Sequence, residues 1–240
     1  SPRFLKVFWE INDRGDLWSF QQTTQEETAT FGGLHNLVLY DEKNGHLREE
    51  EWIRKERLHN SDQRGQSVVG KQGIAVSSMS VLPVARFLGS RFDSNVAAVV
   101  PQNPAHLPAI WCFCSSPEYN EAVRQIDQAL KVTNATLVKV PFDLAHWQQV
   151  AAERYPHGLP KPYSDDPTQW LFHGHPQPST YPLQVAVARL VGYRWPTEQE
   201  AATAAEVVEI QAKSASSAYP ASASSYQNES IAAATAAPQR

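Results

Sequence analysis

The sequence predicts a mixed α/β fold of the α+β type, in which short strands pack with two or more helices. Short aromatic and β-branched runs, separated by glycine and proline, fill the region from Phe4 to Val100. Two stretches with good capping residues and helical apolar spacing follow within residues 116–155. With 240 residues, 42% of them apolar, the chain is long enough for one main core and a smaller appended layer.

Strands are expected wherever an apolar run meets a turn signal. Between Phe4 and Tyr40 these signals are the stretches 12–15 (Asn-Asp-Arg-Gly) and 31–33 (Phe-Gly-Gly), which favour several short strands over one long helix. Five further β-branched or apolar segments are predicted to be strands, at residues 68–79, 82–89, 95–101, 108–113 and 132–142.

Helices are expected where a capping residue precedes a periodic apolar pattern. Ser116 is a good N-cap and Pro117 suits the first helical position, so a helix should run from Pro117 to Lys131. Its predicted inner face consists of Tyr119, Val123, Ile126 and Leu130. Other helices are predicted at residues 49–58, at 144–155 after the cap Asp143, at 183–190 and around 201–213.

The composition divides the chain into three regions. Residues 1–155 form the predicted main domain, and residues 156–197, rich in proline and histidine, are expected to be an extended connector with a short helix. Residues 198–240 are dominated by alanine, serine, threonine and glutamine, which predicts a low-complexity and mostly disordered tail. The chain begins at Ser1 without an initiator methionine, so we expect it to be a piece of a longer protein.

The cysteines and the hydropathy indicate a reducing, cytoplasmic setting. Cys112 and Cys114 lie two residues apart, which is poor disulfide geometry, and no other cysteine is present to complete a thiolate metal site. We interpret both as reduced, buried thiols. No run of about 18 apolar residues could span a membrane, and the first residues lack the basic-then-apolar pattern of a signal peptide. We therefore expect no membrane partner.

Positive charge is concentrated in one stretch of an otherwise acidic chain. The formal net charge of -4 excludes a uniformly basic nucleic-acid coat. The stretch from Arg54 to Arg91, however, contains seven basic residues and only two acidic ones. Cations neutralise phosphates, and glutamine, serine and arginine address base edges. An ordinary solvated face is the alternative explanation. The candidate DNA-binding residues are Arg64, Gln66, Lys71, Gln72, Ser77, Ser78 and Arg91.

A metal site is the main competing pattern. His173 and His175, with Asp165 and Asp166 upstream, have the ligand types of a small metal-dependent hydrolase. The His-Gly-His spacing falls on an irregular segment without a third convergent ligand, so a hydrogen-bonded loop is favoured and no metal is expected. The serines at 115 and 116 lack the elbow glycines that expose a nucleophile, so no catalytic residue is assigned.

Several long stretches together resemble a known protein family. They are residues 70–79, 107–119, 131–137, 161–170 and 182–190. They are similar to the C-terminal half of large single-chain adenine-specific DNA methyltransferases of restriction-modification and phage-defence systems, some of them in DISARM-like loci. The resemblance covers roughly Phe4 to Pro196. Beyond Thr197 the chain departs from the folded sequence that continues in the family, which a truncated or frameshifted end would explain.

The resemblance implies a target-recognition-domain-like fold that binds double-stranded DNA. In the family an N-terminal Rossmann-like catalytic domain holds S-adenosylmethionine and the base, and the recognition region follows it on the same polypeptide. This chain would then contain no cofactor site of its own and would dock with that catalytic domain. The resemblance also implies that Gly70–Met79, preceded by Arg64 and Gln66, faces the DNA, and that Pro117–Phe142 is scaffold.

The base-gripping turn of adenine methylases, Asn/Asp-Pro-Pro-aromatic, has one partial match. In Asn103-Pro104-Ala105-His106 an alanine replaces the second proline and a histidine replaces the aromatic residue, and no upstream glycine fingerprint accompanies it. We interpret it as an ordinary strand-terminating turn and expect no methyl transfer by this chain alone. The alternatives are a binding-only fragment that recognises DNA or a protein and, further off, the metal-dependent hydrolase.

Overall fold

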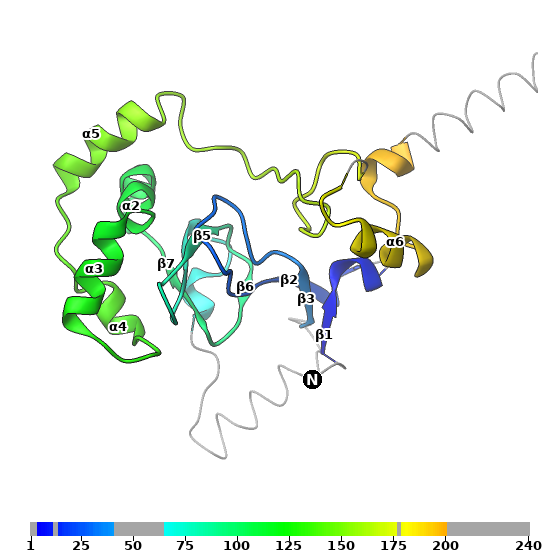
Figure 1. The fold of residues 1–240 in the computed structure, drawn as a ribbon, viewed down its shortest axis with the longest axis horizontal. Coiled ribbons are helices and arrows are strands. Elements are labelled where there is room, and N and C mark those ends of the chain that lie inside the picture. Colours follow the sequence, from blue (N-terminus) through cyan, green and yellow to red (C-terminus); the bar gives the residue numbers. More distant parts are fainter. Residues whose placement is uncertain (1–3, 12–13, 41–64, 177–178, 201–240) are drawn as a thin grey trace, which may run out of the picture. The chain divides into compact units, whose positions relative to one another are not determined.

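The structure, a computed structural model, describes residues 4–11, 14–40, 65–176 and 179–200. These residues form two small sheets and a set of helices, which confirms the predicted mixed α/β fold (Figure 1). The chain divides into two compact units, Ser1–Glu198 and Gln199–Arg240, and every element given below belongs to the first. The helices predicted at 49–58 and around 201–213, and the predicted tail beyond residue 200, lie outside the described residues.

The first sheet is built from the N-terminal strands. Its order is β1 (Leu5–Val7), β3 (Asn36–Leu39), β2 (Trp18–Gln22) and β6 (Arg91–Phe92). β3 is antiparallel to both of its neighbours, whereas β6 joins β2 in parallel, with Arg91 opposite Gln21. A short 3-10 helix, η1 (Phe8–Glu10), follows β1. The short strands predicted before Tyr40 are therefore confirmed.

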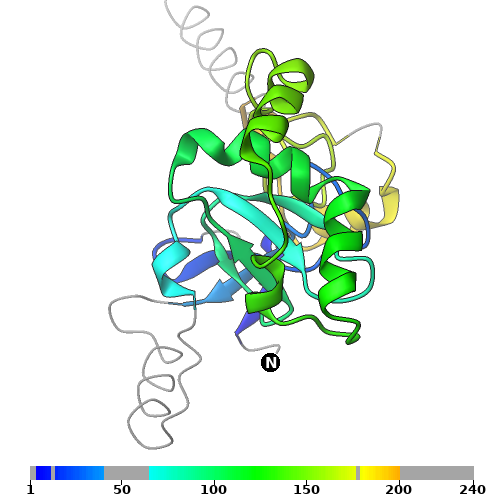
Figure 2. The same cartoon turned by 90° about the vertical axis from the view of Figure 1, so that its left-hand side faces the viewer.

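The second sheet lies at the centre of the core. Its order is β5 (Val84–Phe87), β4 (Gly73–Ser77) and β7 (Val96–Val99), all antiparallel. These strands confirm three of the predicted strand segments. One face, with Ile74 and Val84, packs in the same apolar cluster as helices from residues 107–151 (Figure 2). The opposite face carries a smaller cluster that includes Ala75 and Phe87.

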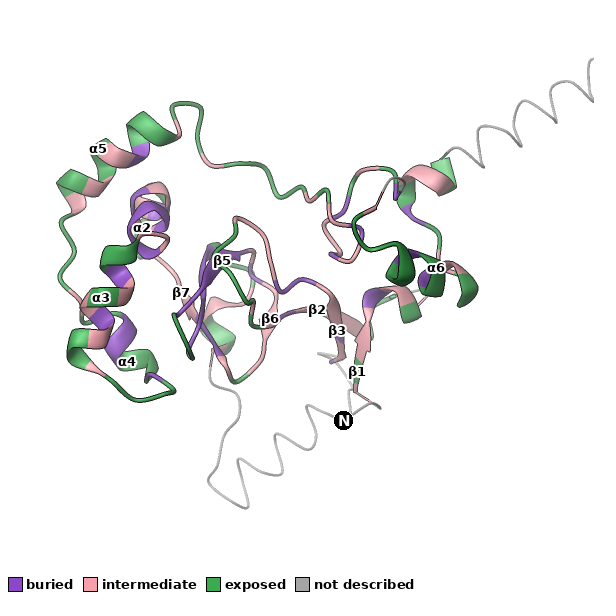
Figure 3. Cartoon of the chain, viewed as in Figure 1, coloured by how far each residue is buried: buried purple, intermediate pink, exposed green. Residues whose placement is uncertain are grey.

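The apolar segment predicted as a strand at 108–113 is a helix, so that prediction was wrong. α2 (Leu107–Cys114) follows the 3-10 turn η3 (Pro104–His106), where Asn103 Oδ1 accepts from Ala105 N at 3.0 Å. Most residues of α2 are buried (Figure 3). The helix contacts both β4 and α5 (Leu144–Arg154). A short run that is apolar on all sides has no periodicity that separates a buried helix from a buried strand.

Both cysteines lie in α2 and are buried free thiols, as predicted. Because they lie on a helix and not a strand, their side chains point to different sides. Burial raises the pKa of the Cys114 thiol to about 12. Burial also raises the pKa of Cys112, an effect that the positive charge of Arg154 partly offsets. Both thiols therefore stay protonated at neutral pH, which makes them poor nucleophiles.

α3 (Pro117–Ile126) begins after the predicted N-cap Ser116 but ends before the predicted Lys131. Asp127 leaves helical geometry, with φ -140°, and its carboxylate accepts from Ala129 N at 2.9 Å. Such a local side-chain bond offers the backbone an alternative to the next helical turn.

Because the helix ends early, two of the four residues predicted for its inner face are not buried. Tyr119 and Val123 are buried as predicted, but Ile126 and Leu130 are 51% and 73% exposed. The helical spacing of these four residues continues past the point where the helix ends, so the pattern alone predicts too long a face.

The prediction of a strand over residues 132–142 was wrong. That stretch instead contains α4 (Asn134–Leu137), and it touches the second sheet through Val132 N, which donates to Ser78 O at 2.8 Å. The hydroxyls of Thr133 and Thr136 lie 2.9 Å apart and hydrogen-bond locally, which competes with strand pairing.

α5 confirms the next prediction, including its cap. Asp143 Oδ1 accepts from His146 N at 3.1 Å, which satisfies one of the unpaired N–H groups of the first turn. Between α5 and α6 (Pro182–Leu190) the described residues form no helix or strand beyond an isolated bridge between Ser164 and Phe172. α6 confirms the short helix predicted at 183–190.

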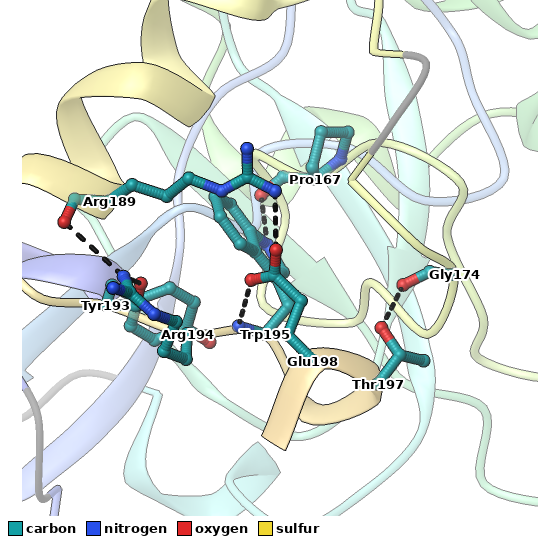
Figure 4. Close-up of polar contacts among 8 residues, drawn as sticks. All are labelled: Pro167, Gly174, Arg189, Tyr193, Arg194, Trp195, Thr197 and Glu198. Carbon is teal, nitrogen blue, oxygen red and sulfur yellow. Dashed lines mark hydrogen bonds and ion pairs between the residues drawn. The ribbon is translucent and has the colours of Figure 1, made fainter. Parts of the chain in front are cut away.

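The segment after α6 contacts the connector through the side chain of Trp195 (Figure 4). Its ring is buried, and its indole N–H donates to Pro167 O at 3.2 Å. Glu198 pairs with Arg189 of α6 and accepts from the backbone N–H of Trp195. Thr197 Oγ1 donates to Gly174 O at 2.9 Å, so the connector is tied down at both of these points.

Candidate nucleic-acid interface

Two glycine turns that touch each other bring the candidate residues together. The first turn, which contains η2 (Gln66–Val68), leads into β4, and the second joins β5 to β6. Gly70 N donates to Gly89 O at 2.8 Å, and both glycines have positive φ, +80° and +84°. A Cβ added to Gly89 would meet the Gly70 backbone at 2.8 Å, so this close approach requires glycine. The paired turns thereby fix the backbone on which the exposed polar side chains stand.

Three of the seven predicted residues, Gln66, Lys71 and Gln72, lie on the first of these turns, and a fourth, Arg91, begins β6 directly after the second. Lys71 and Gln72 are exposed, and no hydrogen bond or ion pair engages the Lys71 ammonium among the described residues. Gln66 and Arg91 meet at Tyr40. Gln66 Nε2 donates to Tyr40 Oη at 3.1 Å, and the Arg91 guanidinium lies 3.6 Å from the centre of the Tyr40 ring.

The other three predicted residues do not join this surface. Arg64 lies outside the described residues. Ser77 is 3% exposed and accepts from Gln25 N at 3.2 Å, while Ser78 is 2% exposed and donates to Asn95 O at 2.8 Å. Both hydroxyls hold loops against the second sheet, so their burial argues against the predicted contact with DNA. The sequence alone does not distinguish a serine pair that faces solvent at the end of a strand from one that is buried and anchors a loop.

Arg86 is a buried cation that holds the side chain of Gln72 in this surface. It is 5% exposed in β5, and its Nη2 donates to Gln72 Oε1 at 3.2 Å. Its Nε and Nη1 have no hydrogen-bond partner among the described residues. Burial lowers the pKa of the guanidinium, and Tyr155 partly offsets this effect. Because a guanidinium only donates, Gln72 must turn its oxygen toward Arg86, which leaves the amide N–H groups of Gln72 for other acceptors.

Two hollows lie on either side of Lys71 and Gln72. The first, of about 750 Å³, is lined by this turn and by residues between Val100 and Leu107. The second, of about 500 Å³, is lined by Gln72, the Gly89 turn and residues of the connector. Gln72 lines both hollows, and neither has an acidic residue in its described lining. The charged side chains in these described linings, which are Lys71, Arg14 and Arg91, are all basic.

The second hollow contains residues that the sequence did not single out. Phe20 and Trp170 stack with their ring centres 4.2 Å apart, and the Arg14 guanidinium lies 5.0 Å from the centre of the Phe20 ring. Phe20 belongs to β2 and Trp170 to the connector, so they are far apart in the sequence and no local pattern joins them. Trp170 does fall in one of the stretches that carry the family resemblance.

Two of the residues considered for a metal site, Asp166 and His173, make local contacts within a loop. Asp166 Oδ1 accepts from Thr168 N at 2.8 Å and from the Thr168 hydroxyl at 2.7 Å. His173 Nδ1 lies 3.1 Å from Ser164 O, and its ring stacks on Tyr163. In the part of the chain that the structure describes, no group of three or more His, Cys, Asp or Glu side chains is placed to hold a metal ion. The hydrolase alternative therefore gains no support.

Two comparisons with known proteins were negative. No protein-family model matches the sequence, and no curated protein matches it either. Within the described residues, no helix has the length and apolar character needed to cross a membrane.

Proposed function

We propose that this chain is the DNA-recognition part of an adenine-specific DNA methyltransferase of a restriction-modification or phage-defence system. The sequence resemblance motivates the enzyme class. The observation that supports DNA binding is the pair of glycine turns, which presents Lys71, Gln72 and Arg91 close together, beside hollows without acidic lining. This is how a chain of net charge -4 would concentrate a local contact for a polyanion.

In this proposal the charged and amide side chains have separate tasks. Lys71 and Arg91 contact phosphates and release counterions, which sets affinity and register. Gln72, whose amide orientation Arg86 fixes, addresses a base edge in a groove. A well-placed pair of such bonds discriminates between bases by about 1 to 3 kcal/mol. Arg86 acts only through Gln72 and is a positioning residue.

S-adenosylmethionine would supply the methyl group in a separate catalytic domain. The glycine turns of this chain do not fit the cofactor, because they are packed against protein. Gly70 lies on Gly89, and a Cβ added to Gly65 would meet the Phe92 ring at 2.4 Å. We therefore assign this chain no chemical step and propose that it transfers no methyl group alone. The free thiols of α2 fit the reducing, cytoplasmic setting that we propose.

The exposed side of α6 is where we place the contact with the catalytic domain. Val185 and Ala188 of this helix are buried, but its other side exposes large apolar side chains. They are Leu183, Val187, Leu190 and Val191, which are 72%, 44%, 85% and 52% exposed. Their spacing is that of one continuous helical stripe, and such a stripe on a soluble helix marks an interaction surface.

The DNA-binding half is tested by duplex binding of the chain as a function of salt. Binding is measured by fluorescence anisotropy with a labelled random duplex. The logarithm of the association constant should fall linearly with the logarithm of salt concentration, with a slope of about -0.9 for each phosphate contact. The matched control is Arg154→Ala, which removes an exposed arginine from α5 and should leave the slope unchanged. No duplex binding at low salt would contradict the proposal.

The docking half distinguishes the methyltransferase from a binding-only fragment. The double substitution Leu183→Glu and Leu190→Glu changes exposed positions, so the melting temperature should hardly change. Methylation of adenine by an added catalytic domain of the family should nevertheless fall at least about tenfold, because buried charges would enter the interface. Methylation that is equally efficient with the double variant would contradict the α6 contact.

A further inference from the structure

We propose that the hollow beside Phe20 and Trp170, here called the aromatic hollow, binds a single unpaired nucleotide. Its base would lie against the apolar wall, and its phosphate would lie at Arg14 and Arg91. An unpaired nucleotide of bound DNA is one source of this ligand and a free mononucleotide is the other. The DNA-borne source rests on the proposed function, whereas the chemistry of the hollow does not.

The size and apolar lining of the aromatic hollow fit a base. Its volume of about 500 Å³ is in the range of small-ligand sites, about 300 to 1,000 Å³. Besides Phe20 and Trp170, its wall has aliphatic side chains from three different segments, Val69, Leu88 and Leu171. Bases that leave a helix are held in proteins by aromatic side chains and guanidinium planes. The stacked ring pair, with Arg14 beside Phe20, supplies both kinds of surface.

The polar groups of the aromatic hollow fit a phosphate and its sugar. Arg14 is exposed, and one of its nitrogens donates to Trp18 O at 3.0 Å, which anchors the side chain and leaves further donors of the guanidinium for a ligand. Arg91 is held over the Tyr40 ring at 3.6 Å. The described lining of the aromatic hollow contains no carboxylate. Two guanidinium groups at one site favour a phosphate, to which arginine forms charge-assisted hydrogen bonds.

Unmet hydrogen-bonding groups in the wall are an independent sign of a polar ligand. Ser90 Oγ and Trp170 Nε1 are buried without a hydrogen-bond partner among the described residues, and both residues line the aromatic hollow. Most buried polar groups in folded proteins have a partner, so two unmet groups in one wall need an explanation. The amide N–H groups of Gln72 are directed away from Arg86 and add donors at the same site. A purine or pyrimidine edge offers acceptors for these donors.

Calorimetric titration of the full chain with deoxyadenosine 5′-monophosphate tests the proposal. Deoxyadenosine and inorganic phosphate serve as the two half-ligands, and each should bind at least about tenfold more weakly than the nucleotide, because each makes only part of the contacts. Arg14→Ala should weaken nucleotide binding at least about tenfold through the loss of charge-assisted bonds, and Arg14→Lys should restore part of it. Arg154→Ala is the charge-matched control and should have no effect.

Trp170→Phe keeps a ring for the Phe20 stack and removes the indole N–H. It should weaken nucleotide binding about threefold or more while the melting temperature changes little. The proposal is overturned if the nucleotide does not bind, or if Arg14→Ala and Trp170→Phe leave its affinity unchanged. Either result would leave the proposed function standing, because duplex binding through Lys71 is measured separately.

A duplex with one unpaired adenine identifies the source of the nucleotide. If the DNA strand supplies it, this duplex should bind more tightly than the fully paired one, deoxyadenosine monophosphate should compete with it, and Arg14→Ala should abolish the difference. If a free mononucleotide is the ligand, the nucleotide still binds and both duplexes bind equally. A chain that binds the nucleotide but no duplex would contradict the proposed function and leave the aromatic hollow intact.

Discussion

The two faces of the β5–β4–β7 sheet differ in what covers them. One face belongs to a large apolar cluster with α2 and its neighbours, in which Trp111 and Phe113 are buried. The other carries a small cluster with Ala75 and Phe87, against which Val68 of the first glycine turn packs. The helix-covered face therefore supplies most of the buried apolar area, and the turns supply fixed positions for exposed polar groups. Substitutions in the two regions should separate stability from binding.

Gly89→Ala should have the largest effect on stability, because the paired turns depend on a close backbone approach. The new Cβ would meet the Gly70 backbone at 2.8 Å, and the residue would keep a φ of +84°. We expect a loss of about 3 kcal/mol in the free energy of unfolding, measured by chemical denaturation, from strain and steric overlap together.

Gly158→Ala is the matched control for that substitution. Gly158 has the same φ of +84°, but a Cβ there would meet nothing within 4 Å. It should cost only the backbone strain, about 1 kcal/mol. Equal losses for the two variants would show that the turns do not press on each other.

Arg86→Met should lower the selectivity of DNA binding without lowering stability. The substitution removes a buried guanidinium, two nitrogens of which have no partner in the described part of the chain, and keeps a long side chain. The free energy of unfolding should stay the same or rise by about 1 kcal/mol, as when buried charges are replaced by apolar residues. Gln72 would lose its fixed orientation, so selectivity between duplexes should fall about threefold to tenfold. A large loss of stability would contradict the positioning role.

The helix-covered region was only partly predictable from the sequence. Caps such as Asp143 are local, and that prediction was confirmed. The buried run that became α2 was mispredicted, because an all-apolar segment has no periodicity and only its packing partners decide its form. α3 was predicted too long, because the aspartate that ends it acts through a local bond that competes with helix.

Only part of the candidate interface could be predicted from the sequence. Charge and glycine spacing pointed to Lys71 and Gln72, since those signals lie within one short segment. The Phe20 and Trp170 stack and the contact of Arg86 with Gln72 join distant segments, so only the fold reveals them. Burial of Ser77 likewise depends on the loop at Gln25 that covers it.

The smallest expected effect concerns the thiols of α2. Burial raises the pKa of both cysteines, that of Cys114 to about 12, so neither should react with iodoacetamide at pH 8 while the protein is folded. Mass spectrometry should show full labelling only after unfolding. Rapid labelling of the folded chain would contradict the burial of α2, and duplex DNA should not change the labelling rate, because these residues lie on the helix-covered face.

The most direct test of the account compares Lys71→Ala with Ser77→Ala in the duplex-binding assay and in denaturation. Lys71→Ala should lower the magnitude of the salt slope by about 1 and leave stability unchanged, because one phosphate contact is lost from an exposed side chain. Ser77→Ala should leave the slope unchanged and cost about 1 kcal/mol of stability, because it removes the bond to Gln25. An unchanged slope for Lys71→Ala, or a reduced slope for Ser77→Ala, would contradict the assignment of DNA binding to the glycine turns.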